Sequence, residues 1–208
     1  MSGTISFNPY ATNQPQDSFL LQTQGYVQGA PYDDTVARLW LATGSLASTE
    51  TLTMWGGVPI TENIIVAGTG ADGIGPSVAR ATTQANATGF STFLQMNSMI
   101  IVPGNTVPLA GVRNAVGFFR LGTQQRLAVQ VDPAVVAALT STDGAINSQA
   151  LYWDVTNYRI TLVTTGGNWA LPTSVRLLSV QTNSKIVSYN STTGAATWVL
   201  GDAAMILI

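Results

Sequence analysis

The sequence contains no histidine and no cysteine among its 208 residues. Histidine is the commonest general base and a common metal ligand, so its absence removes the middle member of any Ser-His-Asp or Cys-His arrangement. Without cysteine the chain can form neither disulfides nor thiolate metal sites, so packing and hydrogen bonding must hold the fold together. We therefore expect a protein that is not an enzyme and that holds no cofactor and no metal.

Charge is also scarce. Charged residues make up 9% of the chain, against about 25% in an average soluble domain. Of the 8 lysine and arginine residues, one is a lysine, Lys185, and the arginines are scattered, while the formal net charge is -2. Nucleic acid is not expected as a partner, because a phosphate backbone needs a clustered positive patch. Low charge is typical of surfaces that are covered in the working state.

Long apolar runs are missing as well. No stretch approaches the roughly 18 residues that would suggest a membrane span. The segment Met1–Phe19 is polar and lacks a basic region followed by an apolar one, so we expect no signal peptide, no membrane partner and synthesis in the cytoplasm. Residues 1–17 are expected to form an extended N-terminal arm, with Phe7 and Tyr10 as its large anchors.

What the chain does contain is a series of strand-like runs between Gly, Pro, Asn and Asp clusters. Their spacing predicts an all-β fold of the jelly-roll or β-sandwich type, with the extended arm and one short helix. We expect a β-rich segment over 18–110 and a sandwich segment over 111–208, which can form a single domain. The expected strands lie near Ser18–Gln22, Val36–Ala42, Thr51–Trp55, Ile60–Ala67, Gly89–Met96, Met99–Val102, Ala115–Leu121, Gln125–Val131, Ile146–Trp153, Tyr158–Val163, Ser174–Val180, Ser184–Asn190, Ala195–Leu200 and Ala203–Ile208.

Local signals mark the helix and two turns. Asp132 at the N-cap and Pro133 at the first helical position predict a short helix over Ala134–Leu139. The segments Trp153–Tyr158 and Asn190–Gly194 predict two hairpin turns, because Asp and Asn side chains bond to nearby backbone and tolerate left-handed geometry.

Two motifs suggest chemistry only weakly. The run Gly68–Gly73 spells GxGxxG, but Gly75-Pro76 interrupts the following segment and no Asp or Glu occurs between Asp72 and Asp132. A dinucleotide site needs both a helix start and such an acidic residue, so a flexible loop is the better interpretation. The adjacent carboxylates Asp33-Asp34 follow Pro31, where turn chemistry explains them better than a glycosidase pair or a calcium site does.

The tryptophans keep a second function class open. Trp40, Trp153 and Trp198 lie in predicted strands beside aliphatic residues, where packing in the core or on a sheet face is the default. Trp169 follows Gly166-Gly167-Asn168 and is expected to be the exposed one. An alternative function is therefore a carbohydrate- or receptor-binding β-sandwich module of a phage or secreted protein.

Short segments spread along the whole chain carry a resemblance to a known family. They are the N-terminal arm, Met54–Val58, Phe118–Gly122 leading into Arg126–Val131, Asp132-Pro133 with its helix, Trp153-Asp154, Asn183–Val187 and the tail ending Ile206–Ile208. Together they resemble the structural cement, or capsid decoration, proteins of tailed bacteriophages. The resemblance implies a jelly roll or related sandwich, homo-oligomers that are often dimers, the phage major capsid protein as partner, and a place on the outer capsid surface of the virion.

A decoration protein of this kind would stabilise the mature head by bridging neighbouring capsomers. Binding to the assembled lattice favours that state by mass action, and weak contacts repeated over a lattice act together. The arm, around Phe7 and Tyr10, is the first candidate for the lattice contacts. The loop Gly68–Pro76, with Gly70 and Asp72, is the second candidate.

The end of the sequence, Ala203–Ile208, is too apolar to be left in water. It is expected to be either a buried strand or a contact between subunits through Ile206 and Ile208.

Overall fold

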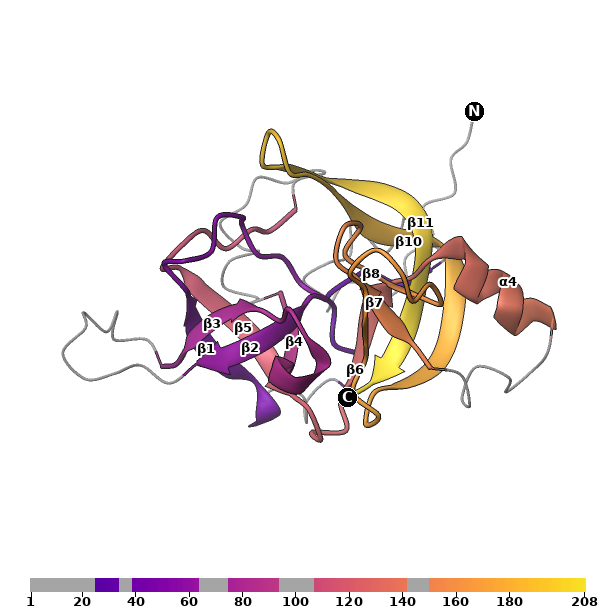
Figure 1. Cartoon of the computed structure of the whole chain (residues 1–208), viewed down its shortest axis with the longest axis horizontal. Helices are drawn as coiled ribbons and strands as arrows, with labels where there is room; N and C mark the ends of the chain where they lie inside the picture. The colour runs from indigo at the N-terminus through magenta and orange to yellow at the C-terminus, as the bar shows by residue number, and fades with distance from the viewer. Residues whose placement is uncertain (1–24, 34–38, 64–74, 94–106, 142–149) are drawn as a thin grey trace, which may run out of the picture.

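The computed structural model of the chain describes residues 25–33, 39–63, 75–93, 107–141 and 150–208 (Figure 1). Within these ranges, α4 (Pro133–Ser141) is the one helix longer than a single turn, and η1 (Gln84–Asn86) is a short 3-10 turn. The remaining elements are strands, which confirms the all-β class predicted from the sequence. The expected arm at 1–17 and the expected strands near Ser18–Gln22 and Met99–Val102 lie outside the described residues.

Five strands close into a small barrel in the order β1-β3-β2-β4-β5, with β5 pairing back to β1. Only the pairing of β1 with β3 is parallel. Fully buried side chains fill the interior, among them Leu46, Ile60 and Phe118, and closure leaves the barrel without a free edge. The strands are β1 (Ala42–Leu46), β2 (Pro59–Asn63), β3 (Ser77–Arg80), β4 (Gly89–Thr92) and β5 (Ala115–Arg120).

A second sheet is built on a long hairpin and has the order β10-β11-β6. Its strands are β10 (Arg176–Asn190), β11 (Ala195–Leu207) and β6 (Arg126–Gln130). The sequence predicts four shorter strands here, and the structure shows two long ones. The register between them shifts at Leu177/Ser179 and at Gln181/Ser184, and Asn183 has a positive φ of 53°, so the predicted gaps are irregularities within continuous strands.

A third, small sheet has the order β8-β7-β9 and consists of β7 (Tyr152–Asp154), β8 (Arg159–Thr161) and β9 (Trp169–Ala170). A bridge between Val131 and Ile160 attaches it to the end of β6. In Figure 1 this sheet lies between the barrel and the β10–β11 hairpin.

The segment 25–31 joins the barrel to the second sheet. The Gly29 amide donates to the carbonyl of Ala128 in β6 at 2.7 Å, and the Gly29 carbonyl accepts from the Phe93 amide at 3.2 Å beside β4. Gln28 is fully buried, and its Oε1 accepts from the Val187 amide of β10 at 2.8 Å. Gly29 has φ +77° and lies against Gly56, a place where only glycine fits without strain.

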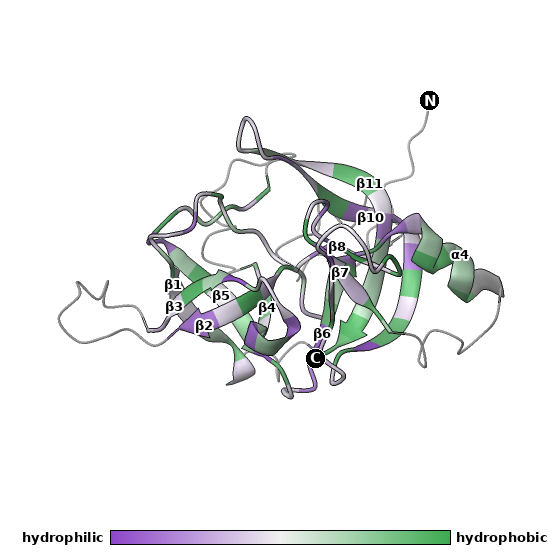
Figure 2. Ribbon diagram, viewed as in Figure 1, coloured by the Kyte–Doolittle hydropathy of each residue, from purple (hydrophilic) through white to green (hydrophobic). Residues whose placement is uncertain are grey.

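One continuous hydrophobic cluster runs through the barrel, the second sheet and the small sheet. Figure 2 shows apolar residues along the barrel strands and along α4. Within α4, Val135 is fully buried, while Val136 and Leu139 pack against the cluster at partial exposure. The three sheets therefore share a core.

Several expectations differ from the structure. The strand expected over Thr51–Trp55 is wrong, because only Met54 pairs, in an isolated bridge with Ala110. Arg80 donates to the carbonyls of Leu52 and Thr53, which holds that segment as a loop. In the strand expected over Val36–Ala42, Leu39 and Trp40 are helical and β1 begins at Ala42, while residues 36–38 lie outside the described residues.

The structure also adds strands that the sequence did not predict, β3 and β9. The closed barrel is not the pair of facing sheets that a jelly roll or sandwich requires, so this finer expectation is not confirmed. Strand β5 comes from the expected segment 111–208 and closes a barrel whose other strands come from 18–110. The two segments thus share one barrel.

Candidate functional site

The described residues offer little room for chemistry. Among them, no group of three acidic side chains is placed to hold a metal ion. A cavity lined by Trp55, Phe93, Leu109 and Val116 has a volume of about 20 Å³, which accommodates a single water molecule rather than a substrate. No helix in these ranges is long and apolar enough to cross a membrane.

A partly buried cluster of Arg80, Glu50, Trp55 and Tyr158 connects the barrel to the small sheet. Arg80 Nη1 lies 2.7 Å from Glu50 Oε2, and its guanidinium carbon lies 5.2 Å from the Trp55 ring and 5.5 Å from the Tyr158 ring. Burial raises the pKa of Tyr158, although the charge of Arg80 opposes this. The Arg80 and Glu50 side chains are only 11% and 15% exposed, so the cluster acts as a structural clamp and not as an accessible site.

Two aromatic contacts fix one face of the β10–β11 hairpin to the barrel side of the molecule. The Tyr189 ring lies 4.5 Å from the Trp55 ring, and the Trp198 ring lies 5.6 Å from the Phe93 ring in an edge-to-face arrangement. Trp198 pairs with Val187, which is buried on the same face. Because side chains alternate along a strand, Ser188, Thr197 and Val199 point to the opposite face.

The exposed outer half of this hairpin is the candidate functional site. From Ile186 to Gly201 the chain carries no Asp, Glu, Lys or Arg. The neighbouring Lys185 is buried, and this burial lowers the pKa of its amine, so the residue is not part of the exposed surface. We name as the hairpin surface the exposed residues Ser188, Asn190, Ser191, Thr192, Thr193, Gly194, Ala195, Thr197, Val199 and Leu200.

The turn at the tip of the hairpin confirms the sequence prediction. Asn190 Oδ1 accepts from the amides of Thr192 at 2.9 Å and Thr193 at 3.1 Å. Gly194 adopts a φ of +68°, and its amide donates to the Asn190 carbonyl at 2.8 Å. The tip is therefore ordered by its own side-chain bonds, and the surface around it is preformed.

Four of the six predicted contact residues, Phe7, Tyr10, Gly70 and Asp72, lie outside the described residues. Ile206 and Ile208 are fully buried within the chain. Of the two alternatives for the C-terminal segment, the buried strand is therefore confirmed, and neither isoleucine is available to a partner.

Asp33, one of the two adjacent carboxylates, contacts a cation instead of a second carboxylate. Its Oδ1 lies 2.7 Å from Arg126 Nε, and its Oδ2 accepts from the Arg126 amide at 2.5 Å. Asp34 lies outside the described residues. The carboxylate of Asp33 thus fastens the 25–33 segment to the start of β6.

Two expectations for tryptophan are corrected. Trp169 is only 8% exposed, because Gly166 and Gly167, both at positive φ, turn the chain so that β9 pairs with β7 opposite Trp153. Trp40 is 54% exposed and does not pack in the core. Apolar neighbours do not distinguish the two residues, because Ala170 and Leu171 follow the buried Trp169 and Leu41 and Ala42 follow the exposed Trp40.

No protein family model, no curated protein and no solved structure matches this chain.

Proposed function

We propose that the chain is a capsid decoration, or cement, protein of a tailed bacteriophage, which binds the outside of the head and stabilises it by bridging capsomers. The observation that best supports this is the uncharged, exposed hairpin surface on an all-β fold. Charged side chains normally cover exposed protein surface and are depleted at the cores of interfaces. A preformed surface of Ser, Thr, Ala, Val and Leu is suited to binding another protein surface.

The size of the hairpin surface limits how tightly it can bind alone. A standard protein interface uses roughly 20–30 residues and about 800 Å² on each side, whereas the hairpin surface has about ten residues. A single contact would therefore be weak. Repetition over a lattice, or a second contact through the N-terminal arm at Phe7 and Tyr10 or the loop with Gly70 and Asp72, would supply the remaining affinity by avidity.

The proposal includes self-association on the capsid and does not require catalysis, a cofactor or a particular β topology. Function depends on the residues at a surface more than on the fold that carries them. The finer expectation of a jelly roll or sandwich stays a prediction that belongs to the family resemblance.

The test is co-sedimentation of the purified chain with DNA-free heads of the phage that encodes it. Val199→Lys places a charge on the hairpin surface, and Val163→Lys places the same charge at a comparably exposed valine after β8; the two valines are 39% and 50% exposed. We expect Val199→Lys to weaken head binding at least about tenfold and Val163→Lys to leave it unchanged, since burying an unpaired charge is costly. Equal binding by the two variants would remove the hairpin surface from the proposal.

A second variant, lacking residues 2–15, tests the arm. Loss of head binding with an unchanged melting temperature would support the arm as a lattice contact. Unchanged binding would exclude it. If neither the full chain nor any variant sediments with heads, the decoration function itself is wrong.

The alternative, a carbohydrate- or receptor-binding module, now depends on a different residue. Trp169 cannot stack on a sugar because it is buried, but Trp40 is half exposed, and exposed aromatic rings are the usual platforms for such ligands. Binding on a glycan array that is lost in Trp40→Ala would favour this alternative. No glycan binding by the full chain would oppose it.

A further inference from the structure

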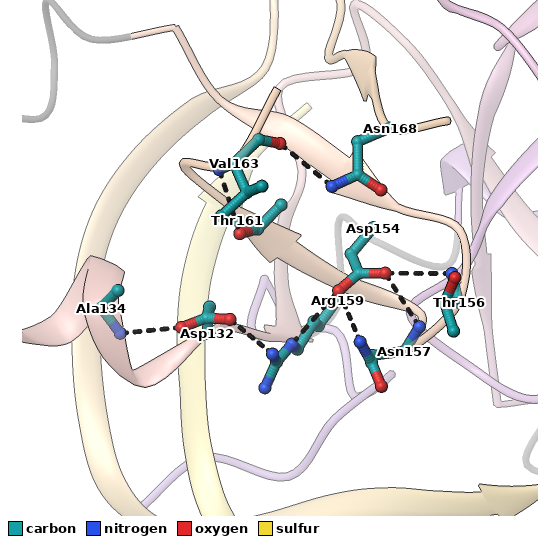
Figure 3. Close-up of polar contacts among 9 residues, drawn as sticks. All are labelled: Asp132, Ala134, Asp154, Thr156, Asn157, Arg159, Thr161, Val163 and Asn168. Carbon is teal, nitrogen blue, oxygen red and sulfur yellow. Dashed lines mark hydrogen bonds and ion pairs between the residues drawn. The ribbon is translucent and has the colours of Figure 1, made fainter. Parts of the chain in front are cut away.

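Most charged side chains among the described residues are compensated by a partner within the chain. Three arginines each contact one carboxylate at 2.6–2.7 Å, namely Arg80 with Glu50, Arg120 with Glu62 and Arg126 with Asp33. A fourth, Arg159, lies between two carboxylates (Figure 3): its Nη2 is 2.5 Å from Asp132 Oδ2, and its Nε is 3.6 Å from Asp154 Oδ2. These charges are neutralised within the chain and are not directed singly at a partner.

None of these ion pairs includes a residue of the hairpin surface. Along the two strands, the charged residues that come next to this surface are Lys185 in β10 and Asp202 in β11. Lys185 is buried. Asp202 lies where β11 begins to pair with β6, and its carbonyl accepts from the Val131 amide at 3.0 Å. A partner that covers the hairpin surface therefore meets no formal charge of the hairpin between these two residues.

The hairpin surface carries hydroxyl groups in place of charges. The hydroxyl residues Ser188, Ser191, Thr192 and Thr197 are all exposed, and Val199 adds an aliphatic side chain among them. Each hydroxyl can donate one hydrogen bond and accept two, and its hydrogen rotates to suit the neighbour. Uncharged groups of this kind can be buried in an interface when backbone, hydroxyl or amide groups opposite supply their hydrogen bonds.

A charged residue of the partner would have no counter-ion on the hairpin surface. Burying an ammonium or a carboxylate there removes its water without returning an ion pair, which is strongly unfavourable. Complementary interfaces place opposite charges against one another, and a surface without charge offers nothing to steer or to repay a charged partner. The chemistry of the hairpin surface thus selects for a partner surface that is also without charge.

We infer that the surface of the head protein that meets the hairpin surface is itself uncharged, and that it presents hydroxyl, amide and backbone groups together with aliphatic side chains. The two surfaces are then joined by hydrogen bonds and apolar contact, without ion pairs. This inference rests on the proposed function and specifies the chemistry of its partner. It has two consequences: salt has no ion pair to screen, and a charge of either sign placed on the hairpin surface is equally unfavourable.

The test is co-sedimentation of the full chain with DNA-free heads, comparing Val199→Lys with Val199→Glu. We expect both variants to weaken head binding at least about tenfold and to differ from one another by less than about threefold. The matched controls Val163→Lys and Val163→Glu should bind as the native chain does. A second measurement needs no variant: the affinity of the native chain for heads should change by less than about threefold between about 0.05 M and about 1 M NaCl.

Two results would overturn the uncharged partner surface while leaving head binding intact. The first is a larger difference between Val199→Lys and Val199→Glu, with one sign of charge tolerated or favoured, which would reveal a charge of the opposite sign on the partner. The second is a larger loss of native binding at high salt. Unchanged binding by both Val199 variants would remove the hairpin surface from the contact, and this inference with it. If the native chain binds no heads at either salt concentration, the proposed function itself is wrong.

Discussion

Substituting Gly89 by alanine should open the barrel between β4 and β5. Gly89 in β4 pairs with Arg120 in β5, and a Cβ built on it would collide with the Phe119 carbonyl oxygen and approach the Phe119 carbonyl carbon to 3.0 Å and Arg120 Cα to 3.2 Å. All three atoms belong to backbone, so no side-chain rotation relieves the contact. The two strands must move apart.

The change in the free energy of unfolding of Gly89→Ala combines two opposing effects. Gly→Ala ordinarily stabilises by about 0.4–1 kcal/mol, because alanine restricts the unfolded chain. Overpacking a tight site costs about 1–3 kcal/mol. The matched control is Gly111→Ala, because the nearest atom to a Cβ there is Asn114 Nδ2 at 3.4 Å, an ordinary contact.

We expect Gly89→Ala to lower the free energy of unfolding by about 1–2 kcal/mol net and Gly111→Ala to leave it equal or slightly raised. Urea unfolding followed by tryptophan fluorescence measures both, and an unchanged m-value would show that the denatured state is not altered. Equal stability of the two variants would refute the close β4–β5 approach and, with it, the barrel closure.

Three further perturbations test other parts of the structure. The double variant Glu50→Gln/Arg80→Met should be destabilised by at least about 1 kcal/mol less than the summed destabilisation of the two single variants, because the two side chains form one partly buried pair. Strictly additive losses in urea unfolding would contradict this. Trp169→Ala should lower the free energy of unfolding by about 3–5 kcal/mol, as expected for a buried tryptophan. Trp40 is exposed, so Trp40→Ala should lower it by less than about 0.5 kcal/mol. Thermal melting distinguishes the two variants, and the reverse order would mean that the two residues are misplaced. Hydrogen bonds from Arg120 hold the pKa of Glu62 below its usual value. This exposed pair should therefore add about 0.2–1 kcal/mol to the free energy of unfolding above the ordinary pKa of glutamate, and nothing once the pH has fallen through the lowered pKa. Glu62→Gln should destabilise the chain at pH 7 and not at pH 2, and an equal effect at both pH values would argue against the pair.

Features with a local cause could be predicted from the sequence. Asp132 and Pro133 mark the start of α4, and the structure shows the expected cap on the Ala134 amide. The turns at Asp154–Asn157 and at Asn190–Gly194 form through the side-chain bonds that these residue types favour. In each case the signal and the structure lie within a few residues of one another.

Features that depend on distant residues could not be predicted. The segment with Leu52 and Thr53 is predicted to be a strand because its residues favour β structure. It forms a loop because its carbonyls accept hydrogen bonds from Arg80, which is far away in the sequence. Strand β3 is short and follows Gly75-Pro76, and it forms because β1 and β2 pair on either side of it. Barrel closure and the burial of Trp169 likewise follow from pairings that periodicity alone does not specify.

The candidate site shows the same division. The absence of charge from Ile186 to Gly201 is visible in the sequence, but its meaning depends on which face of the hairpin is covered. Tyr189 and Trp198 contact Trp55 and Phe93, and these contacts decide that Ser188, Thr197 and Val199 remain exposed. Only the three-dimensional arrangement turns a neutral stretch into a surface.

The measurement that tests the decoration function most directly is the heat resistance of DNA-free heads with and without the purified chain, read in the same samples as co-sedimentation. We expect the chain to sediment with heads and to raise their disruption temperature, and Val199→Lys to reduce both effects while Val163→Lys preserves them. Heads that neither bind the chain nor gain heat resistance from it would contradict the proposed function.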